Sequence, residues 1–118
     1  MSSVTSTNYP FLPVIFRIGE TEQSGLAFVD TGFDGYLIIP EGFEDELGQG
    51  DYLSKWELAD GSVSVGPEYL GKVQIKGLGK DKIPARITCI GDEFILGQEI
   101  IRKYRFIFDH GEKIEVSN

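Results

Sequence analysis

The residues best suited to chemistry are Asp30, Thr31 and Gly32, which directly follow an apolar run at residues 26–29. A second apolar run follows at residues 36–39, so the carboxylate is expected on a turn between two strands. Burying an unpaired carboxylate is costly, so such a group is either satisfied by hydrogen bonds or used as an acid or base. The segment therefore predicts either a structural turn aspartate or a catalytic one.

The elements that must position this turn are short strands separated by glycine turns. Runs of β-branched and aromatic residues predict strands at residues 13–18, 25–30, 36–39, 51–58, 62–65, 68–75, 82–90, 94–96, 104–109 and 113–116. Residues 41–47 and 98–103 suit short helices, and Asp60-Gly61 is a hairpin signal. This density of short strands predicts an all-β domain, either a small barrel or a sandwich.

Length and composition predict one globular domain. A chain of 118 residues with 41% hydrophobic and 25% charged residues is large enough for one modest core. Residues 1–9 are polar and rich in Ser and Thr, so we expect a flexible tail there and a single domain over residues 10–118.

The charge balance and the hydropathy limit the classes of partner. Eleven basic against nineteen acidic residues give a net charge of -8, which argues against a nucleic-acid partner because phosphate binding needs a basic face. No apolar stretch is long enough to span a bilayer, and the N-terminus lacks the layout of a signal peptide. We expect no membrane partner and a cytoplasmic location.

Single copies of cysteine and histidine restrict the available chemistry. Cys89 stands alone in a strand pattern, which excludes an internal disulfide and indicates a buried, inert thiol. His110 lies in an Asp-His-Gly turn without nearby metal-ligating residues, so neither a zinc site nor a Ser-His-Asp triad is expected. The sequence predicts no metal and no cofactor.

Two segments of the chain share a pattern, since residues 28–32 and residues 94–97 each end an apolar strand at a glycine. Asp30-Thr31-Gly32, with its apolar flank at residues 26–29 and with Phe94-Ile95-Leu96-Gly97, resembles the retropepsin-like (clan AA) aspartic proteases. The continuation through Phe33-Asp34-Gly35 is most similar to small bacterial and archaeal members. The resemblance covers roughly residues 13–116.

The resemblance implies a fold, an assembly and a reaction. The fold would be a small closed β barrel with one short C-terminal helix. Such enzymes use two aspartates across a two-fold axis, and this chain carries one Asp-Thr-Gly, so the resemblance implies a homodimeric aspartic endopeptidase acting on a peptide or protein. The implied catalytic residues are Asp30, Thr31 and Gly32, and the implied substrate-binding residues are Phe33, Asp34, Gly35, Ala59, Asp60 and Gly61.

Supporting roles also follow from the resemblance. Residues 95–97 would pack beneath the Asp30 loop, and residues 56–65 would form a flap over the substrate. The Thr31 hydroxyl would bond main-chain groups of the other subunit, and residues 113–116 would join an intersubunit sheet with residues 10–12. Phe33 stands where many retropepsins have alanine, and Gly61 and Gly66 are farther apart than the flap glycines of the viral enzymes.

Three hypotheses remain open from the sequence. The first is the homodimeric aspartic endopeptidase, and the second is a retropepsin-like domain that dimerises and binds peptide without cutting it. The third is a β-barrel interaction module in which Asp30 only bonds turn amides. Asp34 is expected to be a turn residue and not a second catalytic carboxylate of the same chain, and Trp56 is expected to pack in the hairpin or core.

Overall fold

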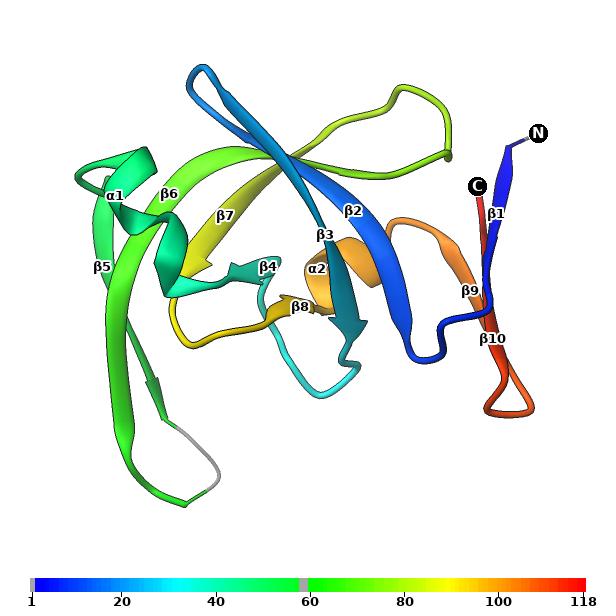
Figure 1. The fold of residues 1–118 in the computed structure, drawn as a ribbon. Helices are drawn as coiled ribbons and strands as arrows, with labels where there is room; N and C mark the ends of the chain where they lie inside the picture. Colours follow the sequence, from blue (N-terminus) through cyan, green and yellow to red (C-terminus); the bar gives the residue numbers. More distant parts are fainter. Residues whose placement is uncertain (1, 58–59) are drawn as a thin grey trace.

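A computed structural model describes residues 2–57 and 60–118 (Figure 1). Its strands are β1 (Ser3–Ser6), β2 (Phe11–Ile18), β3 (Thr21–Val29), β4 (Leu37–Ile39), β5 (Tyr52–Glu57), β6 (Val63–Ile75), β7 (Ile83–Cys89), β8 (Phe94–Leu96), β9 (Arg105–Asp109) and β10 (Lys113–Ser117). The helical turns are η1 (Glu41–Phe43), α1 (Glu44–Leu47) and α2 (Gln98–Ile101). In the described part of the chain, no helix has the length and apolar character needed to cross a membrane.

Six of the strands form a closed barrel. The larger sheet has the order β2-β3-β8-β4-β7-β6-β5, and a further antiparallel pairing between β2 and β6 closes the ring. β5 stays outside the ring because it pairs only along β6, where the two strands form a long hairpin (Figure 1). The predicted small closed β barrel with a short helix near the C-terminus is confirmed.

The barrel core follows from period-two alternation in its strands. In β2, Leu12, Val14 and Phe16 are fully buried while the residues between them are only partly buried. Ile87 on β7 and Leu96 on β8 are also fully buried. Every second side chain of such a strand points into the barrel, so a short chain supplies enough apolar side chains to fill it.

One long strand, β6, replaces the two strands expected at residues 62–65 and 68–75. Two glycines allow β6 to run through crowded points of the barrel. A Cβ on Gly66 would lie 2.4 Å from the carbonyl oxygen of Cys89, and one on Gly71 would lie 2.4 Å from that of Arg17. β6 therefore runs without a break from the tip of the β5–β6 hairpin to the segment that pairs with β2 and closes the barrel.

The N-terminal residues correct a prediction. Residues 1–9 were expected to form a flexible tail, but Ser3–Ser6 is strand β1 and pairs antiparallel with β10. The Ser6 hydroxyl is buried and donates to the Phe11 carbonyl oxygen at 2.6 Å. Backbone hydrogen bonds with β10 order this polar segment, and these bonds do not depend on the side chains from which the composition is judged. β1, β10 and β9 form a separate three-stranded sheet beside the barrel.

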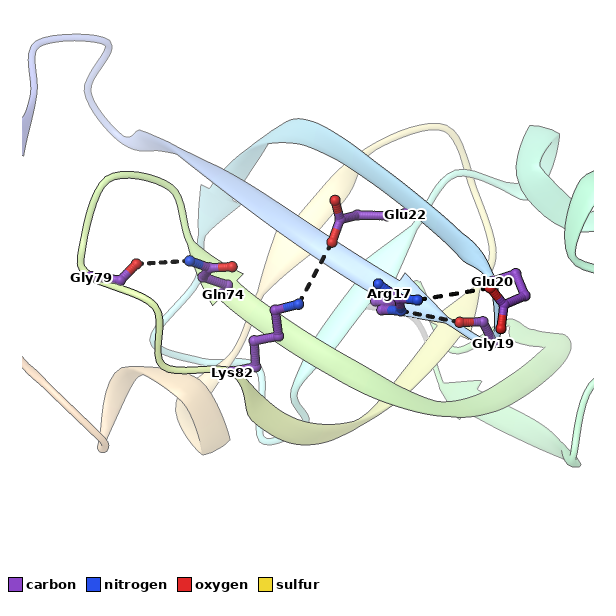
Figure 2. A network of polar contacts seen from close by, with 7 residues as sticks. All are labelled: Arg17, Gly19, Glu20, Glu22, Gln74, Gly79 and Lys82. Carbon is purple, nitrogen blue, oxygen red and sulfur yellow. Dashed lines mark hydrogen bonds and ion pairs between the residues drawn. The ribbon is translucent and has the colours of Figure 1, made fainter.

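Charged and polar side chains hold the outer wall where β2, β3 and β6 meet (Figure 2). Arg17 donates to the Gly19 carbonyl oxygen at 3.2 Å, and Lys82 lies 3.8 Å from the Glu22 carboxylate. Gln74 donates to the carbonyl oxygen of Gly79 at 2.8 Å. These exposed contacts lie on the barrel wall and add modestly to stability.

Cys89 is predicted to be unreactive in the folded protein. Burial raises the pKa of its thiol to about 11, and the thiol lies 3.1 Å from the Pro40 carbonyl oxygen. Since the thiolate is the nucleophile, a thiol reagent at pH 8 should modify the native protein far more slowly than the urea-unfolded chain. Equal modification rates for the folded and the unfolded protein would contradict this prediction. The free energy of unfolding should also fall as the pH rises above the ordinary thiol pKa, because the unfolded chain then loses the thiol proton while the folded protein keeps it.

Candidate functional site

Asp30 sits at the end of β3, where the main chain is held from both sides. The parallel pairing of β3 with β8 ends at Val29 and Leu96, and the next amide, that of Asp30, donates to the Leu96 carbonyl oxygen at 3.0 Å. The Val29 amide donates to the Pro10 carbonyl oxygen at 3.0 Å. The start of the turn is therefore fixed by the sheet and not by the turn alone.

The carboxylate of Asp30 is oriented by its own turn. The Gly32 amide donates to Asp30 Oδ1 at 2.9 Å, and the Phe33 amide donates to the Asp30 carbonyl oxygen at 3.2 Å. A Cβ on Gly32 would lie 3.3 Å from Oδ1, so a side chain would crowd the carboxylate. Asp30 is half-buried and Thr31 is exposed.

The segment from β8 into α2 supports the Asp30 loop from below, as expected for residues 95–97. The Gly97 amide donates to the Tyr36 carbonyl oxygen at 2.9 Å, and the Gln98 amide donates to that of Phe33 at 2.8 Å. The Gln98 side chain adds a bond from Nε2 to the Thr31 carbonyl oxygen at 2.9 Å. These bonds fix the height of the loop relative to the sheet.

At Gly97 the main chain of the β8–α2 segment comes very close to that of the Asp30 loop. A Cβ there would lie 2.3 Å from the Gly35 carbonyl oxygen and 2.8 Å from the Phe33 carbonyl oxygen. Both neighbours are backbone atoms, so neither can move aside without shifting the Asp30 loop. Glycine is required at this position for lack of space.

A cavity of about 470 Å³ opens beside Asp30. One wall is apolar and is formed by Ile38, Ile90 and Ile95. Three carboxylates, those of Asp30, Asp34 and Glu57, are also among its lining residues, and the described residues contribute no cationic side chain to that lining. An apolar cleft with a few convergent polar groups is the usual form of a ligand site.

Phe33 and Trp56 form the boundary between this cavity and a smaller one of about 190 Å³. Their rings pack edge to face with centroids 5.1 Å apart. Gly35 leaves room for the pair, because a Cβ there would lie 2.5 Å from the Phe33 ring. Phe33, Asp34 and Gly35, expected to bind substrate, are thus brought together beside Asp30, and Trp56 of the hairpin joins them.

The β5–β6 hairpin and the Asp30 turn lie at the same end of the molecule, toward the bottom of Figure 1. At the hairpin tip, the Ser62 amide and hydroxyl donate to Asp60 Oδ1, which lowers the pKa of that carboxyl. Asp60 and Gly61 do not line the two cavities beside Asp30. Ala59 lies outside the described residues.

Other candidate features of the described residues lie away from Asp30. A cavity of about 500 Å³ on the outer wall is lined by Arg17, Lys72 and Lys82 together with Gly19, Leu70 and Gly71, the region drawn in Figure 2. His110 is exposed in the β9–β10 turn and contacts the Asp109 carboxylate. Within residues 2–57 and 60–118, no three acidic, cysteine or histidine side chains gather into a metal site.

The sequence reasoning missed several residues of the site. Ile38 and Ile90 of the larger cavity were not singled out, and neither were the polar residues of the smaller one, Glu68, Arg86 and Thr88. Glu68 is buried within β6, next to Tyr69, and pairing of β6 with β7 places it opposite Thr88. Only a strand register would have revealed this, because a single glutamate in an alternating segment reads as solvent-exposed.

Comparisons with known proteins bear on the fold. Neither a protein-family model nor a curated protein matches the chain in sequence. The crystal structure of a retropepsin-like aspartic protease from Rickettsia conorii is similar, with a TM-score of 0.64 and 13% identity over 98% of each chain. The fold is retropepsin-like. At 13% identity this likeness concerns the fold alone.

Replacing Gly97 by alanine should destabilise the protein and shift the Asp30 loop, because the added Cβ meets two backbone oxygens. We expect a loss of about 1–3 kcal/mol in the free energy of unfolding, measured by urea denaturation. Gly42→Ala is the matched control, since a Cβ there has no neighbour within 4 Å. Equal midpoints for the two variants would contradict the assignment.

Proposed function

We propose that the chain is a homodimeric aspartic endopeptidase, which hydrolyses peptide bonds with water activated by two Asp30 carboxylates, one from each subunit. The observation that carries this proposal is the Asp30 carboxylate itself. It is oriented by the Gly32 amide and opens into the larger cavity, on a loop braced by β8 and α2. A turn aspartate with a purely structural role would need neither the bracing nor the cleft.

The reaction follows from two carboxylates that share one proton, since both cannot be ionised at short separation. One Asp30 would act as the base toward water, while the partner subunit's Asp30, protonated, would donate a hydrogen bond to the scissile carbonyl. A single chain carries one Asp-Thr-Gly and therefore supplies one Asp30 carboxylate, so turnover would require the dimer.

The hairpin supports the binding of an extended peptide. Leu53, Val63 and Val65 on β5 and β6 expose large apolar side chains, which would be covered when a substrate or a second subunit lies against them. The peptide would add strand-like hydrogen bonds in the cleft, with Phe33, Asp34 and Gly35 on one side. Asp60 and Gly61 would approach it from the hairpin tip. We place this activity in the cytoplasm, which suits one buried, unpaired cysteine.

We infer a mode of dimerisation other than the one that the resemblance implied. Residues 113–116 were expected to join an intersubunit sheet with residues 10–12, but β10 already pairs on both edges, with β1 and with β9 of its own chain. Phe11 and Leu12 begin β2, which pairs with β3. A second copy would have to displace β1 or β9 to insert a strand next to β10, so we infer a contact elsewhere.

An apolar patch beside the Asp30 turn offers the alternative contact. The exposed side chains of Tyr9 and Phe108 form this patch, with their rings 6.5 Å apart, and the Phe106 ring stacks on that of Phe108 at 6.2 Å. Tyr9 precedes Pro10, whose carbonyl oxygen accepts from Val29, so the patch reaches the chain next to Asp30. Exposed apolar patches of this kind are typical of protein interfaces.

Asp30→Asn should abolish cleavage, because an amide cannot act as the base toward water. Purified protein is incubated with a complex peptide library at pH 4, 5.5 and 7, within the range of roughly pH 3 to 7 where a carboxylate pair can hold one proton. Mass spectrometry should show a loss of at least about 100-fold relative to wild type. Asp81→Asn, in the β6–β7 turn, is the control and should cleave normally. No cleavage by dimeric wild-type protein would favour a non-catalytic peptide-binding domain.

Phe108→Asp should convert the dimer into a monomer, because it places a charge in the apolar patch. Sedimentation velocity at micromolar concentration measures the change, and circular dichroism checks that the barrel is intact. Leu70→Asp is the control, since Leu70 is exposed on the outer wall, away from the patch. A dimeric Phe108→Asp variant would contradict the patch, and a monomeric wild type would contradict the homodimer.

A further inference from the structure

The smaller cavity, which adjoins the one that Asp30 lines, carries more acidic than basic side chains. Its lining includes the carboxylates of Asp34, Glu68 and Glu99, and one cation, Arg86. The larger cavity, which shares Asp34 with it, adds Asp30 and Glu57. Five carboxylates against one guanidinium therefore line the two cavities, so the described part of this cleft is strongly anionic.

Arg86 does not offset this charge for an incoming ligand. Its Nη1 donates to Glu68 Oε2 at 3.3 Å, and the Glu68 side chain is only 10% exposed. Ser54 donates to the other oxygen of Glu68 at 2.8 Å. Drawing Arg86 toward an acidic ligand would leave Glu68 buried without its cation, which is costly. The Arg86 side chain is 60% exposed, but its charge is paired with that of Glu68, so the remaining carboxylates leave the cavity with a net negative charge.

The two other carboxylates remain accessible. Asp34 is exposed and lines both cavities, while Glu99 is half-buried and lies 3.4 Å from Arg102, which is not among the lining residues. The aromatic side chains of Phe33, Tyr36 and Trp56 complete the walls. Aromatic rings next to carboxylates make a favourable environment for a cationic side chain.

The size of the cavity limits what it can hold. Its volume of about 190 Å³ is below the roughly 300–1,000 Å³ of pockets that take drug-sized ligands. One long side chain is a suitable occupant, provided that the rest of its chain lies in the neighbouring cleft. The shared wall of Phe33 and Trp56 keeps the two spaces adjacent.

We propose that this cavity is a specificity subsite for a lysine or arginine side chain of the peptide that lies in the cleft next to Asp30. The inference rests on the proposed peptide-hydrolase function. Asp34 and Glu99 attract the cation, Trp56 packs along its aliphatic part, and the Glu68–Arg86 pair forms the polar wall. An acidic side chain is rejected by the same carboxylates.

Trp56 allows binding to be measured without catalysis, because it is the single tryptophan of the chain. The probe is a set of octapeptides of alternating serine and valine in which one lysine is moved through the positions. Matched sets carry norleucine or glutamate instead. Titration into Asp30→Asn protein is followed by tryptophan emission, so binding is read while the peptide stays intact.

At one position the lysine peptide should bind about tenfold tighter than its norleucine counterpart, and the glutamate peptide should bind more weakly than either. Adding Asp34→Asn or Glu99→Gln should reduce the preference to about threefold or less, whereas adding Asp81→Asn should leave it unchanged. Raising the salt concentration should shrink the preference, because the attraction is partly screened.

Equal affinity for lysine and norleucine peptides, or no binding by any peptide, would overturn the subsite. So would a preference that survives in both cavity variants. Wild-type cleavage of the same peptides separates this proposal from the hydrolase: cleavage without a lysine preference overturns only the subsite. Lysine-dependent binding without cleavage by wild type contradicts the hydrolase and leaves the subsite standing.

Discussion

The whole site depends on the backbone contact between the Asp30 loop and the start of α2. Amides of Gly97, Gln98 and Glu99 donate to carbonyl oxygens of the loop that runs from Phe33 to Tyr36. Gly97 permits the approach because no side-chain atom fits between the two backbones. The positions of Phe33 and Asp34 therefore follow from main-chain hydrogen bonds, to which the Gln98 side chain adds one more, while the Gly32 amide orients the Asp30 carboxylate.

The sequence predicted the parts of the fold that depend on local patterns. Alternating apolar residues located nearly all the strands, and the Asp60-Gly61 turn located the hairpin. The shared apolar-strand-to-glycine pattern singled out the Asp30 segment and residues 94–97, and the structure adds what the pattern did not predict, that their strands are adjacent and parallel. The resemblance then supplied barrel closure, which depends on pairing β2 with β6 across much of the chain.

The errors lie where long-range pairing overrides local composition. The Ser/Thr-rich N-terminus forms a strand because β10 offers it a backbone edge, and β6 continues through Gly66 and Pro67 because β5 pairs with it there. The smaller cavity was missed for the same reason. Its residues come from five separate segments, and the contact between Glu68 and Arg86 exists only once the register of β6 and β7 is set.

The three-stranded sheet has a consequence for how the protein is controlled. With β1, β10 and β9 paired inside one chain, the strands of this sheet find their hydrogen-bonding partners without a second copy. Obligate dimers, by contrast, acquire their stability from assembly. Under the proposed mechanism folding is a first-order event and formation of the two-carboxylate centre is a second-order one. The cell would then contain folded but inactive monomers, and proteolytic activity would rise more steeply than the concentration of the protein.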